Sequence, residues 1–243
     1  MSRSVSSPDF KYTPSRNPYW DKLMHLPKEM EGLAFTDGQT EIHRGSWRKH
    51  FLSSPTTNPQ SLLHVEVGCN AGHVCLEWAK QNPDSCYIGI DWKFKQVYRL
   101  AEKSQKNQVK NLLAFRANAE RLPYMFSPGE IDYLHYFFPD PWAKKAQMKN
   151  RTADEEWLKA LAPLLSGRGI FHIKTDHAGY YDFMRENLAR LDHLYEVVEE
   201  TRNLHAGNPQ AHLLKIPEVT LFERLFVKDG LPIHSIKLRS KIA

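Results

Sequence analysis

The sequence predicts an α/β protein with a mostly parallel sheet that is covered by helices on both faces. From residue 61 onward, short apolar runs alternate with segments in which apolar residues recur at helical spacing, a pattern typical of βαβ units. The predicted strands are residues 62–67, 86–91, 112–115, 131–138 and 169–175. The fourth run first alternates and then becomes richer in large apolar side chains, as expected for a buried strand of a parallel sheet.

Apolar residues at helical spacing predict three helices between and after these strands. Their apolar faces are formed by Phe94, Val97, Tyr98 and Ala101, by Trp157, Leu161, Leu164 and Leu165, and by Tyr180, Met184, Leu188 and Leu191. The second helix is predicted to begin at the capping-box pattern of residues 152–155 (TADE), with Thr152 as the cap. We expect these stripes to pack in the core.

The length of 243 residues allows one α/β domain and an extension. We assign residues 61–243 to the domain. Residues 1–60 contain six prolines and no sustained periodicity, so we interpret them as an N-terminal extension that is either loosely packed or in contact with nucleic acid. The alternative is that Trp47 and Phe51 pack on the core.

Composition indicates a cytoplasmic protein without a metal. No stretch approaches the apolar length of a membrane span, and the first ten residues are polar. The three cysteines, Cys69, Cys75 and Cys86, are odd in number and form no Cys-x-x-Cys pair, so neither a disulfide framework nor a zinc site is expected. The net charge of +5 is compatible with a polyanionic partner.

The strongest functional signal is residues 138–145 (FPDPWAKK), which directly follow a predicted strand. Ligands of open α/β sheets bind beyond the carboxyl ends of the strands. The two prolines should end the strand and hold the Asp140 carboxylate in a defined place. Trp142 can stack on a base. This segment is therefore a candidate nucleotide site.

A basic cluster adjoins this segment. Lys144, Lys145, Lys149 and Arg151 lie between residues 140 and 151, with one acid among them. Such a run is often only a solvated surface, but beside an aromatic at a strand end it favours a contact with the phosphates of a charged substrate.

A second signal is the turn at residues 66–72 (EVGCNAG). Glu66 ends a strand, and Gly68 and Gly72 allow a tight turn and a close approach of the backbone to a ligand. This spacing differs from the Gly-x-Gly-x-x-Gly fingerprint of dinucleotide sites. The turn also lacks a basic residue, which favours S-adenosylmethionine over NAD.

Polar residues at the next two strand ends extend this site. Asp91 follows the glycines by some twenty residues, the position from which a carboxylate can hold two ribose hydroxyls. Asn118 follows the third strand, where its side-chain carbonyl can accept the adenine amino group. Together with Glu66, these residues describe an adenosine site.

These motifs resemble the tRNA (guanine-N7-)-methyltransferase family, which consists of class I enzymes with a Rossmann-like sheet that use S-adenosylmethionine. The resemblance covers the chain from about residue 62 to its end, through residues 66–72, 89–91, 118–119, 138–145, 175–180 and 220–223. It implies methyl transfer to guanine(46) in the variable loop of tRNA, and no obligatory protein partner is evident.

The resemblance also implies roles for particular residues. The cofactor would be bound by Glu66, Gly68, Gly72, Asp91, Asn118 and Asp140, and the substrate by Lys144, Asp176, Thr220, Phe222 and Glu223. The chain departs from the usual bacterial pattern at Asn118, Asp91 and Leu221 and in a thinner basic stretch at residues 146–150. The last two departures bear on the tRNA contacts.

The chemistry of guanine N7 limits what the site must supply. N7 carries a free lone pair, so attack on a sulfonium methyl needs in-line placement and no general base. The Asp140 carboxylate would stabilise the positive charge that develops on the purine. Asp176 or Glu223 would accept the N1–H and N2–H donors of guanine. Asp176 could also cap the following helix, and Glu223 could be a surface residue of the last strand.

Three other classes remain open. An NAD-dependent oxidoreductase is disfavoured by the glycine pattern. A methyltransferase acting on an exocyclic amine of a nucleic-acid base could use residues 140–142 in a similar way. A non-catalytic RNA-binding module would keep the basic cluster and Trp142 but would not bind the cofactor.

Overall fold

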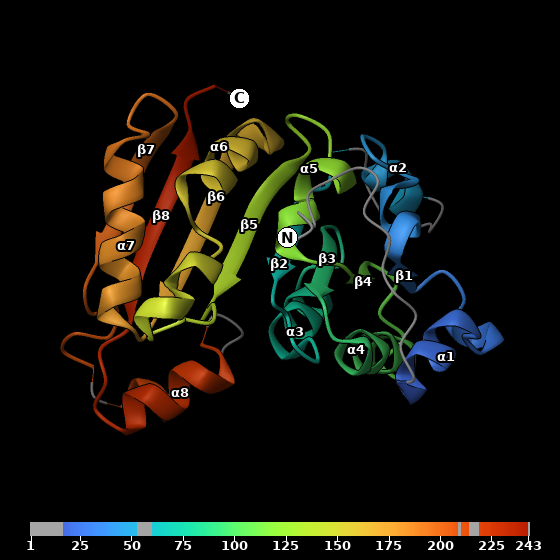
Figure 1. Cartoon of the computed structure of the whole chain (residues 1–243). Helices are drawn as coiled ribbons and strands as arrows, with labels where there is room; N and C mark the ends of the chain where they lie inside the picture. The colour runs from blue at the N-terminus through green and yellow to red at the C-terminus, as the bar shows by residue number, and fades with distance from the viewer. Residues whose placement is uncertain (1–16, 53–59, 209, 214–218, 243) are drawn as a thin grey trace.

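A computed structural model describes residues 17–52, 60–208, 210–213 and 219–242. Within these residues a single sheet runs through the molecule (Figure 1), with strand order β1-β4-β3-β2-β5-β6-β8-β7. Neighbouring strands are parallel from β1 to β6, whereas β8 runs antiparallel to both β6 and β7. The expected α/β fold with a mostly parallel sheet is confirmed.

The elements have the following bounds. The strands are β1 Ala34–Thr36, β2 Leu63–Val67, β3 Cys86–Asp91, β4 Leu112–Arg116, β5 Ile131–Phe137, β6 Leu165–Thr175, β7 Tyr195–Thr201 and β8 His234–Ser240. The α-helices are α1 Pro18–Met24, α2 Trp47–Leu52, α3 His73–Gln81, α4 Phe94–Lys106, α5 Leu122–Met125, α6 Glu155–Leu161, α7 Ala178–Ala189 and α8 Leu221–Lys228. The 3₁₀ turns are η1 Lys28–Met30, η2 Asp37–Glu41, η3 Ala119–Arg121, η4 Lys145–Asn150, η5 Ala162–Leu164 and η6 Ala211–Leu213.

The sheet separates two apolar cores. Alternate residues of β4 show this division, because Leu113 and Phe115 face one core while Leu112 and Ala114 face the other. The first core is covered by α2, α5, α6 and α7, and the second by α1, α3 and α4. Helix α8, red in Figure 1, lies beyond the carboxyl ends of β5 and β6. This edge of the sheet is therefore where the candidate site lies.

The described part of the N-terminal segment packs tightly. β1 adds a parallel strand beside β4, and Trp47 is fully buried, with its indole Nε1 donating to the Met125 carbonyl at 2.8 Å. The Glu130 carboxylate accepts hydrogen bonds from the backbone N–H of Gly45 and Trp47. Packing of Trp47 and Phe51 on the core is confirmed, and a loosely packed arm is wrong for residues 17–52. The division at residue 60 stays a prediction.

Several boundaries differ from those expected. Asp154 caps α6 through a 2.8 Å bond from the Trp157 N–H to its carboxylate, so the cap predicted at Thr152 is wrong. Strand β6 begins at Leu165, earlier than predicted, and β5 ends one residue earlier, at Phe137. The early end of β5 matters because Phe138 then begins the site segment.

Candidate active site

The glycine turn after β2 depends on backbone conformation and on space. Gly68 and Gly72 both have left-handed φ, +75° and +67°. A side chain at Gly72 would also collide with Leu100, because an added Cβ would lie 2.2 Å from its Cδ1 atom. At Gly68 an added Cβ would meet nothing within 4 Å. The turn therefore presents an open backbone surface at Gly68 and a closely packed one at Gly72.

Asp91 ends β3 and lies against this turn. Its two carboxylate oxygens accept the backbone N–H of Asn70 at 3.1 Å and of Lys93 at 2.8 Å. Burial raises the pKa of Asp91, the two N–H donors oppose that rise, and the charge of Asp140 adds to it. Asp140 follows β5, which is separated from β3 by β2 alone, so the two carboxylates lie at the same edge of the sheet.

Glu66 lies behind the turn. Its side chain is buried, and its Oε2 accepts the backbone N–H of Cys75 on α3 at 3.1 Å. Burial is the main cause that raises the pKa of Glu66 to about 7, the Cys75 hydrogen bond opposes it, and the Asp91 charge adds to the rise. Glu66 thus supports the turn from the inside.

Asn118 follows β4 and caps η3, with its side-chain oxygen accepting the Glu120 N–H at 3.1 Å. Because β4, β3 and β2 are neighbours in the sheet, Asn118, Asp91 and Glu66 follow or end adjacent strands at the same edge. The structure therefore brings together the three residues from which the sequence predicts an adenosine site.

Residues 138–142 cross this edge in an unusual conformation. Phe138 and Trp142 both have left-handed φ, +53° and +42°, which costs free energy for residues other than glycine and is concentrated at functional sites. The Phe138 N–H donates to the Lys174 carbonyl of β6 at 2.8 Å. Asp140, at the middle of the segment, is exposed.

Arg151 anchors residues 138–142 to the protein. It is buried, and its guanidinium donates to the carbonyls of Pro141 at 2.9 Å and Gly179 at 3.1 Å. The same group lies over the rings of Tyr180 and Phe183. Arg151 therefore fixes residues 138–142 against α7. Its guanidinium is bound by carbonyl groups and aromatic rings of the protein.

The three lysines of the basic cluster lie differently. Lys144, Lys145 and Lys149 are all exposed, and η4 has no buried residue. They follow directly from the segment that carries Asp140. This side of the site is therefore accessible to a polyanion.

The end of β6 places Asp176 beside the site. Thr175 is buried, and its hydroxyl accepts the His177 N–H at 3.1 Å. The cap of α7 is His177, whose Nδ1 accepts the Tyr180 N–H at 3.0 Å. Asp176 is therefore not the cap of this helix, and its carboxylate is half-buried.

Helix α8 brings the C-terminal motif to the same place. Thr220 and Glu223 form a capping box, with bonds of 3.0 and 3.2 Å between their side chains and each other's N–H. Phe222 is 50% exposed. Its ring stacks on Phe226, whose ring in turn lies 5.5 Å from that of Phe138. Glu223 is therefore a buried helical residue, and the alternative of a surface strand position is wrong.

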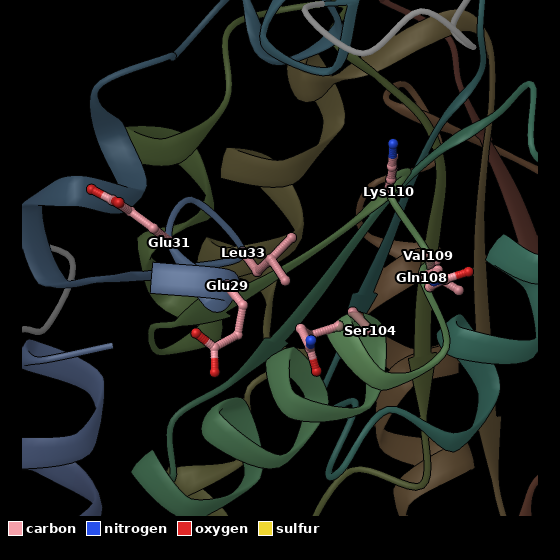
Figure 2. Close-up of a pocket in the computed structure, with 8 residues that line it drawn as sticks. Glu29, Glu31, Leu33, Ser104, Gln108, Val109 and Lys110 are labelled. Carbon is pink, nitrogen blue, oxygen red and sulfur yellow. The ribbon is translucent and has the colours of Figure 1, made fainter. Parts of the chain in front are cut away.

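A separate pocket of about 490 Å³ lies away from these residues (Figure 2). It is formed by residues before β1, in the last turn of α4 and between α4 and β4, including Glu29, Leu33, Ser104 and Lys110. It therefore opens at the amino ends of the strands.

Among the described residues no group of three or more His, Cys, Asp or Glu could hold a metal ion. None of the helices formed by the described residues is long and apolar enough to cross a membrane.

Solved structures of other proteins share this fold. The 16S rRNA methyltransferase KamB superposes with a TM-score of 0.57 at 16% identity, covering 81% of this chain and 93% of that one. This likeness concerns the fold. The fold and the edge site together define a class I methyltransferase.

Sequence relatives narrow the class. A family described as "Putative methyltransferase" matches residues 60–236. A tRNA (guanine-N(7)-)-methyltransferase of Macrococcus caseolyticus is 30% identical over 73% of this chain and 81% of its own length. A bifunctional glycosyltransferase/methyltransferase of Fusobacterium nucleatum is 30% identical over 92% of this chain and 32% of its own length. The chain belongs to the tRNA (guanine-N(7)-)-methyltransferase family. It is therefore an enzyme whose methyl donor is S-adenosylmethionine.

Proposed function

We propose that this enzyme transfers the methyl group of S-adenosylmethionine to N7 of a guanine in tRNA, at guanine(46) of the variable loop. The observation that carries this proposal is that Glu66, Asp91, Asn118 and Asp140 end or follow four neighbouring strands at the carboxyl edge of the sheet, beside the open glycine turn. The reaction takes place in the cytoplasm, in agreement with three free cysteines.

The cofactor binds along the ends of β2, β3 and β4. Asp91 holds the two ribose hydroxyls, and Asn118 accepts the adenine amino group. Gly68 offers the close approach that the methionine part of the cofactor needs, because the space beside its backbone is open. Glu66 and Gly72 support this surface from inside, through the Cys75 hydrogen bond and the contact with Leu100.

Asp140 is the catalytic residue. It is exposed at the same edge of the sheet as Asp91, so its carboxylate can face both the sulfonium and the base that accepts the methyl. As the methyl moves, positive charge passes from sulfur to the purine, and a fixed carboxylate beside the purine lowers the energy of that state. The lone pair of N7 needs no base, so the remaining requirement is in-line placement.

The substrate binds on the side of residues 142–149 and α8. Lys144, Lys145 and Lys149 contact phosphates, since all three are exposed. Phe222 and Trp142 offer ring surfaces to an unpaired base. Arg151 is excluded from the phosphate contacts because its guanidinium is buried and binds two carbonyls.

The test is methylation of an unmodified tRNA transcript, followed by borohydride reduction and aniline cleavage, which cut RNA at N7-methylguanine. Cleavage at guanine(46) supports the proposal. Cleavage at another guanine would overturn the position, and methyl incorporation without cleavage would show that an atom other than guanine N7, such as an exocyclic amine, accepts the methyl. The Asp140→Asn variant is the matched control, because it keeps the shape of the side chain and removes its charge.

A further inference from the structure

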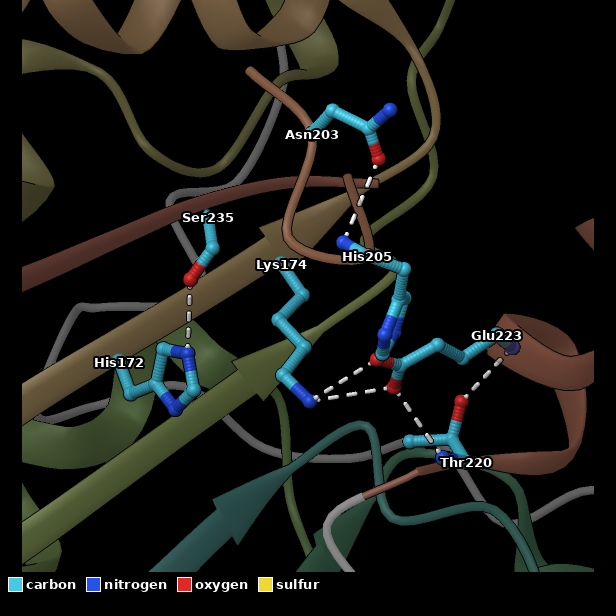
Figure 3. A network of polar contacts seen from close by, with 7 residues as sticks. All are labelled: His172, Lys174, Asn203, His205, Thr220, Glu223 and Ser235. Carbon is cyan, nitrogen blue, oxygen red and sulfur yellow. Dashed lines mark hydrogen bonds and ion pairs between the residues drawn. The ribbon is translucent and has the colours of Figure 1, made fainter. Parts of the chain in front are cut away.

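A polar cluster of Lys174, Glu223 and His205, in which the lysine and the glutamate are buried, links β6 to α8 (Figure 3). Lys174 is on β6, His205 lies between β7 and α8, and Glu223 is in the first turn of α8. The Lys174 ammonium bonds both oxygens of Glu223, at 3.1 and 3.2 Å, and the His205 Nε2 lies 2.7 Å from one of them. The side chains of Lys174 and Glu223 are almost completely excluded from solvent.

The Glu223 carboxylate has little capacity left for a substrate. A carboxylate offers about four acceptor positions. Its Oε1 has Lys174 and His205 as partners, and its Oε2 has Lys174 and the Thr220 N–H. Reading of guanine by Glu223 would therefore require breaking at least one buried charge-assisted bond, which is costly in a site of low polarity.

The cluster joins the segments that surround the substrate. The Lys174 backbone carbonyl accepts the Phe138 N–H, and the Lys174 ammonium lies 4.8 Å from the centre of the Phe137 ring. Thr175 ends β6, and Asp176 is the residue that follows it. One lysine thus connects the start of the Asp140 segment, the end of β6 and the capping box of α8.

Asp176 differs from Glu223 in every respect that matters for binding guanine. It is half-buried rather than fully buried. Its carboxylate has no hydrogen bond or ion pair to the described part of the chain. Both of its oxygens can therefore accept the adjacent N1–H and N2–H donors of guanine.

We propose that Asp176 alone reads the pairing edge of guanine, and that Lys174, His205 and Glu223 are positioning residues which hold α8 and never contact the substrate. This inference rests on the proposed function. The family resemblance assigns both Asp176 and Glu223 to substrate binding. In this proposal Asp176 binds the guanine, whereas Glu223 holds α8 in place.

The experiment compares tRNA that carries guanosine or inosine at the target position. Inosine keeps N7 and N1–H and lacks the N2 amine, so it removes one bond to a reading carboxylate. The wild-type enzyme should prefer guanosine by about ten- to a hundredfold in kcat/KM. Asp176→Asn should reduce this preference to about threefold or less. Glu223→Gln and His205→Gln should keep the preference while raising KM for tRNA by about tenfold.

A rescue experiment separates positioning from substrate contact. Lys174→Met leaves the Glu223 carboxylate buried without its ammonium, and should raise KM for tRNA more than any other change in the cluster. Adding Glu223→Gln to it should recover at least about tenfold of that loss. Calorimetry with S-adenosylhomocysteine confirms in each variant that the cofactor site is intact.

The outcomes separate this inference from the proposed function. Loss of the guanosine preference in Glu223→Gln, or its full retention in Asp176→Asn, would overturn the inference. Absence of rescue in the double variant would also overturn the positioning role. Failure of the wild-type enzyme to methylate N7 in either RNA would instead overturn the proposed function.

Discussion

Replacing Glu66 by glutamine should stabilise the protein, and the gain should depend steeply on pH. The Glu66 side chain is buried, and its pKa is raised to about 7, chiefly by burial. Glutamine has nearly the same shape and keeps an oxygen that can accept the Cys75 N–H. The substitution therefore removes the cost of a buried charge and leaves the packing in place.

The size of the gain follows from the two pKa values. A rise from 4.5 to about 7 corresponds to about 3 kcal/mol. Below pH 4.5 the carboxyl is protonated in both states, so the wild-type protein loses no stability. Between pH 4.5 and about 7 the unfolded chain ionises while the folded one keeps its proton, and stability falls as pH rises. Above about pH 7 the full loss is present.

The assay is urea unfolding of both proteins between pH 4 and pH 8. The difference in unfolding free energy between Glu66→Gln and wild type should be about 2–3 kcal/mol larger at pH 8 than at pH 4. Glu77→Gln, an exposed change on helix α3, should give a difference near zero throughout. A constant difference for Glu66→Gln at every pH would refute the reasoning, since a changed hydrogen bond alone gives no such slope.

Three further predictions concern the active site. Asp140→Asn should keep cofactor binding and slow methyl transfer about a hundredfold in single-turnover assays, because loss of one electrostatic group costs on the order of 3 kcal/mol. Asp91→Ala should weaken S-adenosylhomocysteine binding in calorimetry by a similar factor, because it removes charge-assisted bonds to the ribose. Joint replacement of Lys145 and Lys149 by alanine should flatten the dependence of log tRNA affinity on log salt by roughly one to two from a slope of about −2 to −3.

Each of these has a distinct contrary result. Single-turnover rates near wild type in Asp140→Asn would remove its catalytic role. An unchanged cofactor affinity in Asp91→Ala, or a loss of tRNA affinity of this variant in electrophoretic shifts, would show that the adenosine site lies elsewhere. The same salt slope in the double lysine variant would place the phosphate contacts on another face, with the exposed Arg44 and Lys49 as the next candidates, because Arg48 is paired with Asp132.

The inner strands could be predicted from sequence because they are buried on both faces and are therefore mostly apolar. The outer strand β7 lacks this signal, since five of its seven residues are exposed, and it carries three glutamates. The packing of the N-terminal segment also gives no local sequence signal. Its prolines and polar residues suggested a loose arm, whereas the bonds from Gly45 and Trp47 to Glu130 are contacts between distant parts of the chain.

The edge site was predictable because its parts follow strand ends, and parallel strands bring their ends together. The roles within the basic cluster were not predictable. Arg151 and Lys149 are alike in sequence, yet only Arg151 turns inward to the Pro141 and Gly179 carbonyls. Lys174 gave no signal of its own, because its partner Glu223 lies 49 residues away. The Thr-x-x-Glu pattern at residues 220–223 did contain the capping box and could have placed Glu223 on a helix.

The most direct test of the central claim is nucleoside mass spectrometry of unmodified tRNA after incubation with the enzyme and labelled S-adenosylmethionine. The account predicts label in N7-methylguanosine in the wild-type reaction, and about a hundredfold slower formation of the same nucleoside with Asp140→Asn. Label in a base methylated on an exocyclic amine, or no label although calorimetry shows cofactor binding, would contradict it.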